Sequence, residues 1–361
     1  MCRSAAMALV LGAMLVSACG GSSAGGQELR PTPQVPVTRL APTTSTPPTE
    51  PTLRSSPAPA STLSTVAATE SATVTAPPEL SAPVTAAPTT SIPDGRAPPG
   101  AFEGSGVWLD VYEWSPSSTD GDPKVTPDQV AAMAEIGMKT LYIQSARTSK
   151  EADLSDPDRF GEFVDAAHSH GMKVVSWYLP NHLDELQDLR RVLAPLDAGV
   201  DGLGIDLESA KQPDLGLRNQ RAIDLVKQAT EEAGEVPVGA VTFAPQALDR
   251  YEPETWPLFP WQEVADAADV MVPMAYWTIY RDKFPASADP VAYTDETLNL
   301  IRERVGPAVP VHSAGGLLNE SDTAQVSAAV EAARRHGVIG VSMYSWSGYR
   351  PGQMESMRTG G

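Results

Sequence analysis

Asp201-Gly-Leu-Gly-Ile-Asp-Leu-Glu208 places two carboxylates two residues apart at the end of an apolar run. If this run is a β-strand, Asp206 and Glu208 point to the same face, because strand side chains alternate. Their Cα atoms would then lie roughly 6.5 Å apart. Like charges at that separation resist ionising together, so the pair should retain a proton near neutral pH. Such a carboxylic acid is what cleavage of a glycosidic bond requires, and a solvated strand end is the alternative interpretation.

The stretch is the fourth of eight apolar, β-branched or aromatic segments that alternate with amphipathic segments. One amphipathic segment opens with Thr126-Pro127-Asp128, a helix cap followed by proline, and others end at glycine. The predicted strands are Gly106–Trp114, Lys139–Ser145, Lys173–Leu179, Gly202–Leu207, Pro237–Phe243, Val270–Trp277, Pro310–Ser313 and Ile339–Trp346.

Eight strands with seven intervening helices predict a (β/α)8 TIM barrel. The residues after Trp346 include Pro351 and several glycines, so the eighth helix should be short or absent. A doubly wound sheet is the alternative, but no Gly-rich phosphate loop follows the first predicted strand.

In a TIM barrel the active site lies at the carboxyl ends of the strands. Four tryptophans fall at these ends: Trp114, Trp177, Trp277 and Trp346. Aromatic faces stack on the apolar faces of sugar rings, whereas carboxylates and amides bind hydroxyls. Each tryptophan alone is more often a packing residue, but four at one rim beside two carboxylates favour a sugar-binding site.

The octapeptide resembles the fourth-strand signature of family 18 glycoside hydrolases, the chitinases and their relatives. That signature reads Asp-Gly, two residues, then Asp-x-Asp-x-Glu in overlapping register. The resemblance implies that Glu208 is the general acid and that Asp206 orients the N-acetyl group of the substrate, whose carbonyl is the internal nucleophile. Met274-Ala275-Tyr276 resembles the Met-x-Tyr of the sixth strand, whose tyrosine binds the acetamido group, and Trp346 matches the last-strand tryptophan.

Two positions depart from this pattern. Gly204 stands where the signature has an aspartate, and Trp277 stands where an aspartate follows the tyrosine. These departures imply a changed mechanism, a different sugar, or a barrel that binds glycans without cutting them. The Asp-x-Glu strand, together with Asp110 on the first strand, also resembles the family 25 lysozymes, which cleave peptidoglycan. Both resemblances indicate polymers that contain N-acetylhexosamine.

Composition divides the chain into three segments. Residues 1–18 hold an apolar stretch behind one basic residue, which predicts a secretory leader. Val16-Ser-Ala-Cys19 resembles the bacterial lipobox, which implies a lipidated (palmitoylated) Cys19; a general secretion leader is the alternative. Residues 19–100 contain nearly half of the 34 prolines and no aromatic residue, which predicts a disordered tether. Residues 101–361 should form the barrel of a protein anchored on the extracellular side of the cell membrane.

The net charge and the spacing of the histidines limit the classes of partner and cofactor that we expect for this protein. Acidic and basic residues balance before residue 101, so the net charge of −19 belongs to the barrel and disfavours nucleic acid as a partner. We expect no metal or other cofactor, because no His-Glu-x-x-His spacing occurs and the His168-Ser-His170 pair falls at the end of a predicted helix, where interaction with the helix dipole is the expected role. The chain is therefore expected to be a glycoside hydrolase, with a non-catalytic glycan-binding lipoprotein as the alternative. The expected catalytic residues are Glu208, Asp206 and Tyr276, and the expected sugar contacts are Asp110, Trp114, Gln144, Tyr178, Trp277 and Trp346.

Overall fold

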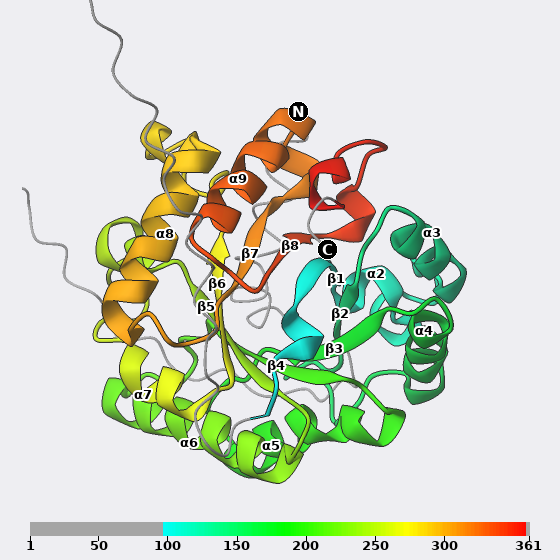
Figure 1. The fold of residues 1–361 in the computed structure, drawn as a ribbon. Helices are drawn as coiled ribbons and strands as arrows, with labels where there is room; N and C mark the ends of the chain where they lie inside the picture. The colour runs from blue at the N-terminus through cyan, green and yellow to red at the C-terminus, as the bar shows by residue number, and fades with distance from the viewer. Residues whose placement is uncertain (1–96, 359–361) are drawn as a thin grey trace, which may run out of the picture. The chain divides into compact units, whose positions relative to one another are not determined.

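A computed structural model describes residues 97–358, which form a closed barrel of eight parallel strands in sequence order (Figure 1). This architecture confirms the (β/α)8 prediction. The predicted leader, Cys19 and nearly all of the predicted tether lie outside the described residues. The strands are β1 Gly104–Leu109, β2 Thr140–Gln144, β3 Lys173–Tyr178, β4 Gly202–Leu207, β5 Val238–Phe243, β6 Val270–Ala275, β7 His312–Leu317 and β8 Gly340–Tyr344.

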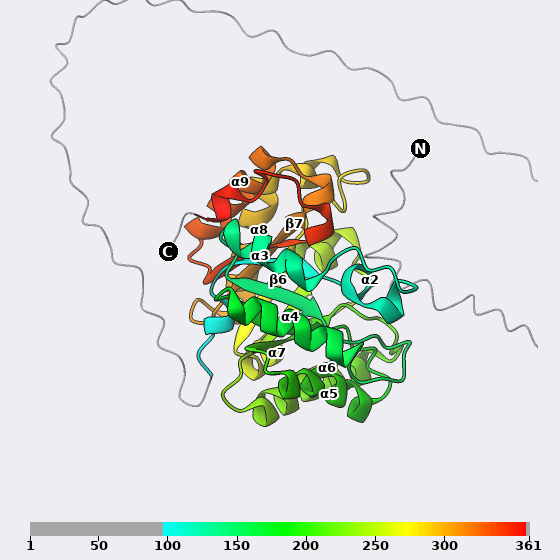
Figure 2. The ribbon, with the colours of Figure 1, turned by 90° about the vertical axis from the view of Figure 1, so that its right-hand side faces the viewer.

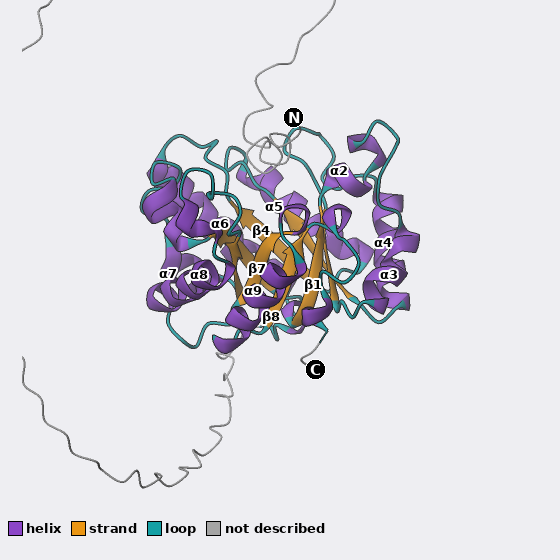
Figure 3. Ribbon diagram, turned by 90° about the horizontal axis from the view of Figure 1, so that it is seen from above, coloured by secondary structure: helices purple, strands orange, loops and turns teal. Residues whose placement is uncertain are grey.

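Helices surround the barrel, with the strands at the centre of the molecule (Figures 2 and 3). Within residues 97–358, only short 3-10 turns follow β8, as the glycines and Pro351 predict. None of the described helices is both long and apolar enough to cross a membrane. The α-helices are α2 Val111–Trp114, α3 Val130–Glu135, α4 Pro157–Ser169, α5 Glu185–Leu193, α6 Leu215–Ala233, α7 Trp261–Ala267, α8 Pro290–Val305 and α9 Thr323–Arg335.

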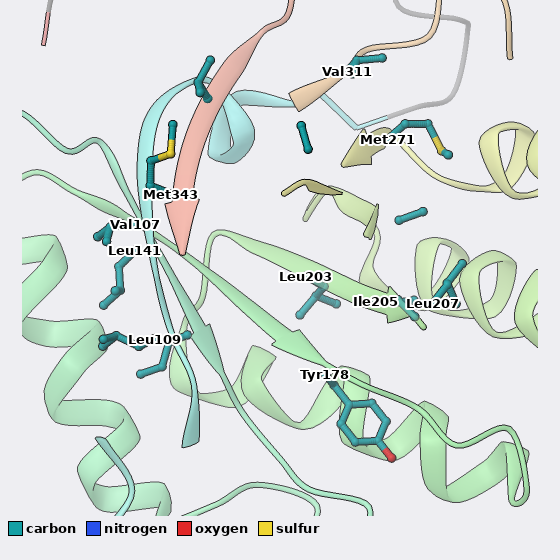
Figure 4. Close-up of a cluster of buried hydrophobic side chains, with 14 of the residues drawn as sticks. Val107, Leu109, Leu141, Tyr178, Leu203, Ile205, Leu207, Met271, Val311 and Met343 are labelled. Carbon is teal, nitrogen blue, oxygen red and sulfur yellow. The ribbon is translucent and has the colours of Figure 1, made fainter. Parts of the chain in front are cut away.

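The alternation of β4 places its two faces in different surroundings. Leu203, Ile205 and Leu207 belong to the large hydrophobic cluster between the strands and the helices (Figure 4). The alternate positions, Gly204 and Asp206, therefore face the barrel interior. A second cluster that includes Trp108, Tyr142 and Trp177 fills that interior. The apolar residues of β4 thus hold the strand in place while its acidic residue is directed inward.

The first strand ends earlier than its sequence predicts. Asp110 accepts a hydrogen bond from the Tyr112 backbone N–H, and Glu113 accepts one from the Asp110 backbone N–H, forming a capping box. This cap starts α2 at Val111, so the prediction of a strand through Trp114 was wrong. The short helix turns the chain at the carboxyl end of β1 and leaves Asp110 at the rim of the barrel.

Candidate active site

Five of the residues predicted from the sequence meet at the carboxyl end of the barrel. Gln144 is the last residue of β2, Asp206 lies near the end of β4, and Asp110, Glu208 and Tyr276 follow directly after β1, β4 and β6. Since all eight strands are parallel, these ends converge at one opening of the barrel. The chain therefore assembles an acidic site at the end of the barrel where such folds carry chemistry.

Asp206 and Glu208 form the centre of this site. Asp206 is only 6% exposed, and its Oδ1 atom has no hydrogen-bond partner among the described residues. Burial, reinforced by the charge of Glu208, raises the pKa of Asp206 well above its ordinary value. Burial and the charge of Glu252 raise the pKa of Glu208 to about 8. The raised pKa of Glu208 thus has burial and Glu252 as its causes, whereas the two-residue spacing pointed to repulsion from Asp206.

A pocket opens beside Glu208, between the ends of β4, β5 and β6. Its volume is about 470 Å³, counting the space at its mouth. Its walls combine two carboxylates and three tyrosines with apolar side chains, so it can exclude water from a bound ligand while presenting a few polar groups. The lining residues are Glu208, Phe243, Ala244, Ala247, Glu252, Met274, Tyr276, Ile279, Tyr280 and Tyr293.

Tyr276 connects this pocket to the far side of the opening. It is buried, and besides burial the charges of Glu208 and Asp206 raise the pKa of its hydroxyl. Its ring centroid lies 6.2 Å from that of Tyr344. Tyr344 in turn donates a hydrogen bond of 2.6 Å to Asp110. Tyr276 and Tyr344 thus link the carboxylates of β4 to the carboxylate that follows β1.

A second acidic pair lies at the junction of β1 and β8. Asp110 is buried, which raises the pKa of its carboxyl, while the Tyr344 hydrogen bond opposes the increase. Burial and the charge of Asp110 raise the pKa of Glu113 to about 7. Glu113 accepts hydrogen bonds from the Ser345 hydroxyl at 2.6 Å and from the Ser347 backbone N–H at 3.1 Å. These contacts attach the loop after β8 to the start of α2.

Gly204, one of the two departures from the family 18 pattern, lies beside the side chain of Trp177. A Cβ atom at position 204 would lie 3.1 Å from the Cβ of Trp177, closer than side-chain packing normally allows. The Trp177 indole points into the barrel, donates to the Leu109 carbonyl at 3.1 Å, and packs edge-on against Trp108. The barrel interior below Asp206 is therefore filled by an indole rather than by a second carboxylate.

Three predicted sugar contacts belong to the core instead. Trp114, Tyr178 and Trp277 are almost completely buried, which contradicts their assignment to the sugar-binding surface. Trp114 packs edge-on against two phenylalanines of α4 and donates to the Gln144 carbonyl. The Tyr178 hydroxyl, on the outer face of β3 (Figure 4), donates to Asp188 at 2.6 Å. The Trp277 ring lies against Gly316, where a Cβ atom would overlap it.

The remaining predicted contacts differ in accessibility. Gln144 faces the opening, but its Oε1 accepts a hydrogen bond from the Val111 backbone N–H, which stabilises the start of α2. Trp346 is partly exposed, stacks on Tyr349 with centroids 4.8 Å apart, and donates to Gln129 at 3.3 Å. Of the four tryptophans expected at the rim, Trp346 is the one that offers substantial surface to a ligand. The aromatic surface of the pocket comes mainly from tyrosines.

Two acidic residues of the site were not identified from the sequence. Glu113 stands three residues after Asp110, and this capping-box spacing could have indicated its position. Glu252 follows a five-residue π-helix, Ala247–Tyr251, that has no sequence signature. Its place in the pocket depends on how the loop after β5 folds over the barrel end.

The site carries no arrangement suited to a metal ion. Among residues 97–358, no group of three or more His, Cys, Asp or Glu side chains is placed to bind one. His312 lies inside the barrel between the Phe102 carbonyl and the Ser342 hydroxyl, and its burial lowers its pKa to about 4. His312 is therefore a neutral core residue.

The fold and the site together define a TIM barrel with a cluster of buried carboxylates at its carboxyl end. In sequence the chain matches no family model and no curated protein. Its barrel is similar in structure to those of several solved proteins.

Structures with TM-scores of at least 0.50 include two cortex-lytic enzymes and a chitinase. The spore cortex-lytic enzyme SleL of Bacillus cereus has a TM-score of 0.52 at 10% identity, covering 71% of this chain and 73% of SleL. SleL of Bacillus megaterium QM B1551 has a TM-score of 0.50 at 8% identity, covering 73% of each chain. The family GH18 chitinase of Cycas revoluta, in complex with allosamidin, has a TM-score of 0.52 at 11% identity, covering 71% of this chain and 98% of the chitinase. At these identities the likeness establishes the TIM-barrel fold.

Proposed function

We propose that the protein is a glycoside hydrolase in which Glu208 is the general acid. The observation that carries this proposal is a partly exposed carboxylic acid that keeps its proton at neutral pH and lines a pocket. Protonation of a glycosidic oxygen needs an acid of this kind within reach of the substrate. The buried Asp206 next to it adds the second acidic group that the chemistry requires.

The proposed substrate is a glycan that contains N-acetylhexosamine. Asp206 Oδ1 is buried and, in the described part of the chain, unpaired, which is a costly arrangement unless a ligand supplies a partner. Tyr276 lines the same pocket as Glu208 and is near both carboxylates. In the proposed mechanism Asp206 and Tyr276 align the acetamido group so that its carbonyl oxygen can attack the anomeric carbon. The chitinase and cortex-lytic names of the similar structures agree with this substrate class.

The proton balance of the proposed mechanism is simple. The Glu208 carboxyl gives its proton to the leaving oxygen as the C–O bond breaks and becomes a carboxylate. Water then attacks the anomeric carbon, the bond from that carbon to the acetamido oxygen breaks and restores the acetamido group, and Glu208 takes the proton released by that water. Asp110 and Gln144 would contact sugar hydroxyls at the opening, and Trp346 would provide a stacking surface farther out.

The proposed location is the outer face of the cell membrane. The apolar leader and Cys19 support lipid anchoring, and the proline-rich segment would hold the barrel away from the lipid surface. Extracellular polysaccharide would then be within reach of the site. Labelling with a radioactive or alkyne fatty acid, in cells that express the wild type or Cys19→Ala, tests this anchor.

Hydrolysis by the full chain tests the function. Chitin oligomers, peptidoglycan and neutral polysaccharides are incubated with the wild type, Glu208→Gln and Glu254→Gln, and new reducing ends are measured. Glu254 is an exposed carboxylate outside the pocket and serves as the matched control. We expect turnover by the wild type and Glu254→Gln, and a loss of at least about a hundredfold in Glu208→Gln.

Two outcomes contradict the proposal. Equal turnover by Glu208→Gln and the wild type would remove Glu208 as the acid. Glycan binding by the wild type, measured by calorimetry, without turnover of any substrate would instead establish a non-catalytic glycan-binding protein.

A further inference from the structure

Glu252 shares a pocket with Glu208 although the two residues follow different strands. Glu208 comes directly after β4, whereas Glu252 follows the π-helix in the loop after β5. Both line the same cavity, whose remaining walls are mostly apolar. Neither carboxyl group forms an ion pair or a side-chain hydrogen bond within residues 97–358. The two acids therefore share an environment of low polarity with little to screen one from the other.

The titratable groups around Glu208 are acidic or phenolic on every side. Asp206 approaches from β4, Glu252 from the loop after β5, Tyr276 and Tyr280 from the segment after β6, and Tyr293 from α8. No Lys, Arg or His is present among the described residues that line the pocket. Farther across the opening, the Asp110 and Glu113 pair adds further acidity. A negative charge on Glu208 would thus have no positive partner in the pocket.

We propose that Glu252 is a positioning residue of the candidate active site, whose negative charge across the pocket keeps the acidic proton on Glu208. This inference rests on the function proposed above and assigns a role to a residue that makes no bond with the substrate. Glu252 acts through space, and no atom passes between it and Glu208. No nearby cation offsets its influence, because the described residues that line the pocket include no Lys, Arg or His and are otherwise mostly apolar.

Asp206 is not equivalent to Glu252 in this respect. Asp206 is buried in the barrel interior on the same strand as the site, and burial raises the pKa of its carboxyl well above the ordinary value. Glu252 is partly exposed to solvent. Burial is the larger cause that raises the pKa of Glu208, and the charge of Glu252 is the second. Gly204 has no carboxylate, so β4 carries no second acidic side chain below Asp206 and Glu208. The negative charge that acts on Glu208 is therefore assigned to Glu252, which lies outside β4.

The decisive experiment measures the proton on Glu208 directly. Full-length protein labelled with ¹³C at the glutamate side-chain carbonyl is titrated by NMR, and Glu208→Gln identifies the Glu208 signal. In Glu252→Gln the pKa of Glu208 should fall by about one unit. Glu252→Asp, which keeps the charge, should retain most of the elevation, and Glu254→Gln should change nothing. Circular dichroism checks that each variant is folded. If Glu252→Gln does not fold, Glu252→Ala takes its place.

Activity supplies a second measurement. The alkaline limb of the pH profile of kcat/KM reports the acid of the free enzyme, so in Glu252→Gln it should move to lower pH by the same amount. At pH well below the limb, kcat should stay within about threefold of the wild type, since the acid is protonated in both.

Three results separate this inference from the proposed function. An unchanged Glu208 titration in Glu252→Gln overturns the inference even if the enzyme is active. Loss of turnover at every pH with an unchanged titration also overturns it, because Glu252 would then take part in bond making. Absence of turnover by the wild type overturns the proposed function, while the NMR titration still decides whether Glu252 controls the proton of Glu208.

Discussion

The Tyr344 hydroxyl, at the end of β8, donates a hydrogen bond of 2.6 Å to the Asp110 carboxylate, directly after β1. This contact joins the last strand of the barrel to the first at the opening where the candidate site lies. Tyr344 also faces Tyr276, so it connects the two groups of carboxylates. The alternation of β8 directs Tyr344 inward, whereas Trp346, one of the aromatic residues predicted to contact sugar, lies in the 3-10 turn that follows β8.

Replacing Tyr344 by Phe removes this hydrogen bond without a large change in volume. The Asp110 oxygen that accepts it would be left buried and unpaired, so the free energy of unfolding should fall by about 1–3 kcal/mol. Urea denaturation at pH 7 measures the effect. Tyr349→Phe, at the partly exposed rim, is the control, and an equal effect of the two substitutions would refute a specific role for the Asp110 contact.

Glu113 should make the stability of the barrel depend on pH. Its pKa is about 7 in the folded protein against an ordinary value of 4.5, so the fold disfavours its charged form. The stabilisation is therefore fully present below pH 4.5 and is lost as the pH rises through 7. For Glu113 the loss is on the order of 3–4 kcal/mol, at about 1.4 kcal/mol per pKa unit.

Glu113→Gln tests this dependence, because glutamine stays neutral. Urea denaturation at pH 5 and pH 7.5 should show a smaller decline in the variant than in the wild type. The buried acids Asp110, Asp206 and Glu208 remain, so part of the decline persists. The exposed Glu135→Gln is the matched control. An identical decline in Glu113→Gln and the wild type would show that Glu113 is not responsible.

Gly204 should not tolerate the aspartate of the family 18 signature. Its side chain would crowd Trp177 and place a carboxylate in an apolar interior, which should lower the free energy of unfolding by at least about 2 kcal/mol. Gly204→Ala adds only the crowding, so the difference between the two variants measures the buried charge. Thermal unfolding at pH 5 and pH 8 provides the comparison. If Gly204→Asp proves as stable as the wild type, the indole of Trp177 does not restrict this position.

Trp277 and Trp346 should respond differently to truncation. Trp277→Ala removes a fully buried ring and should destabilise the fold by about 3–5 kcal/mol. Trp346→Ala should change stability much less, because the ring is partly exposed, and should weaken glycan binding by about fivefold or more. Denaturation and calorimetry with chitin oligomers measure the two quantities. Unchanged affinity in Trp346→Ala would remove it from the proposed sugar contacts.

The barrel could be predicted because each strand and helix is indicated by a sequence pattern within a short segment. Hydrophobic periodicity, helix caps and glycine stops repeat along the chain, and each can be recognised without knowing its neighbours in space. The position of β4 was predicted with its bounds, and the alternation of its side chains directs Asp206 to the barrel interior. The end of β1 was mispredicted because the apolar residues of α2 read as a continuation of the strand, although Asp110 and Glu113 form a capping box.

The accessibility of single aromatic residues could not be predicted in the same way. In the sequence, Trp114 and Trp277 come shortly after the ends of β1 and β6. Whether each ring is exposed depends on the side chains and backbone that pack against it, and these come from segments such as α4 and Gly316. Four tryptophans near strand ends therefore did not make four sugar contacts. The tyrosines of the pocket come from strand ends, a loop and a helix that only the closed barrel brings together.

The sequence by itself determined the eight-stranded barrel, the inward direction of Asp206 and the two-residue spacing that places Glu208 at its rim. These properties follow from backbone periodicity, which acts over a few residues. Only the tertiary structure decided what surrounds that pair: Trp177 beside Gly204, Tyr276 and Tyr344 at the opening, and Glu252 in the same pocket. The pKa of Glu208 depends on burial and on the charge of Glu252, and both arise only once the closed barrel brings segments far apart in the sequence together.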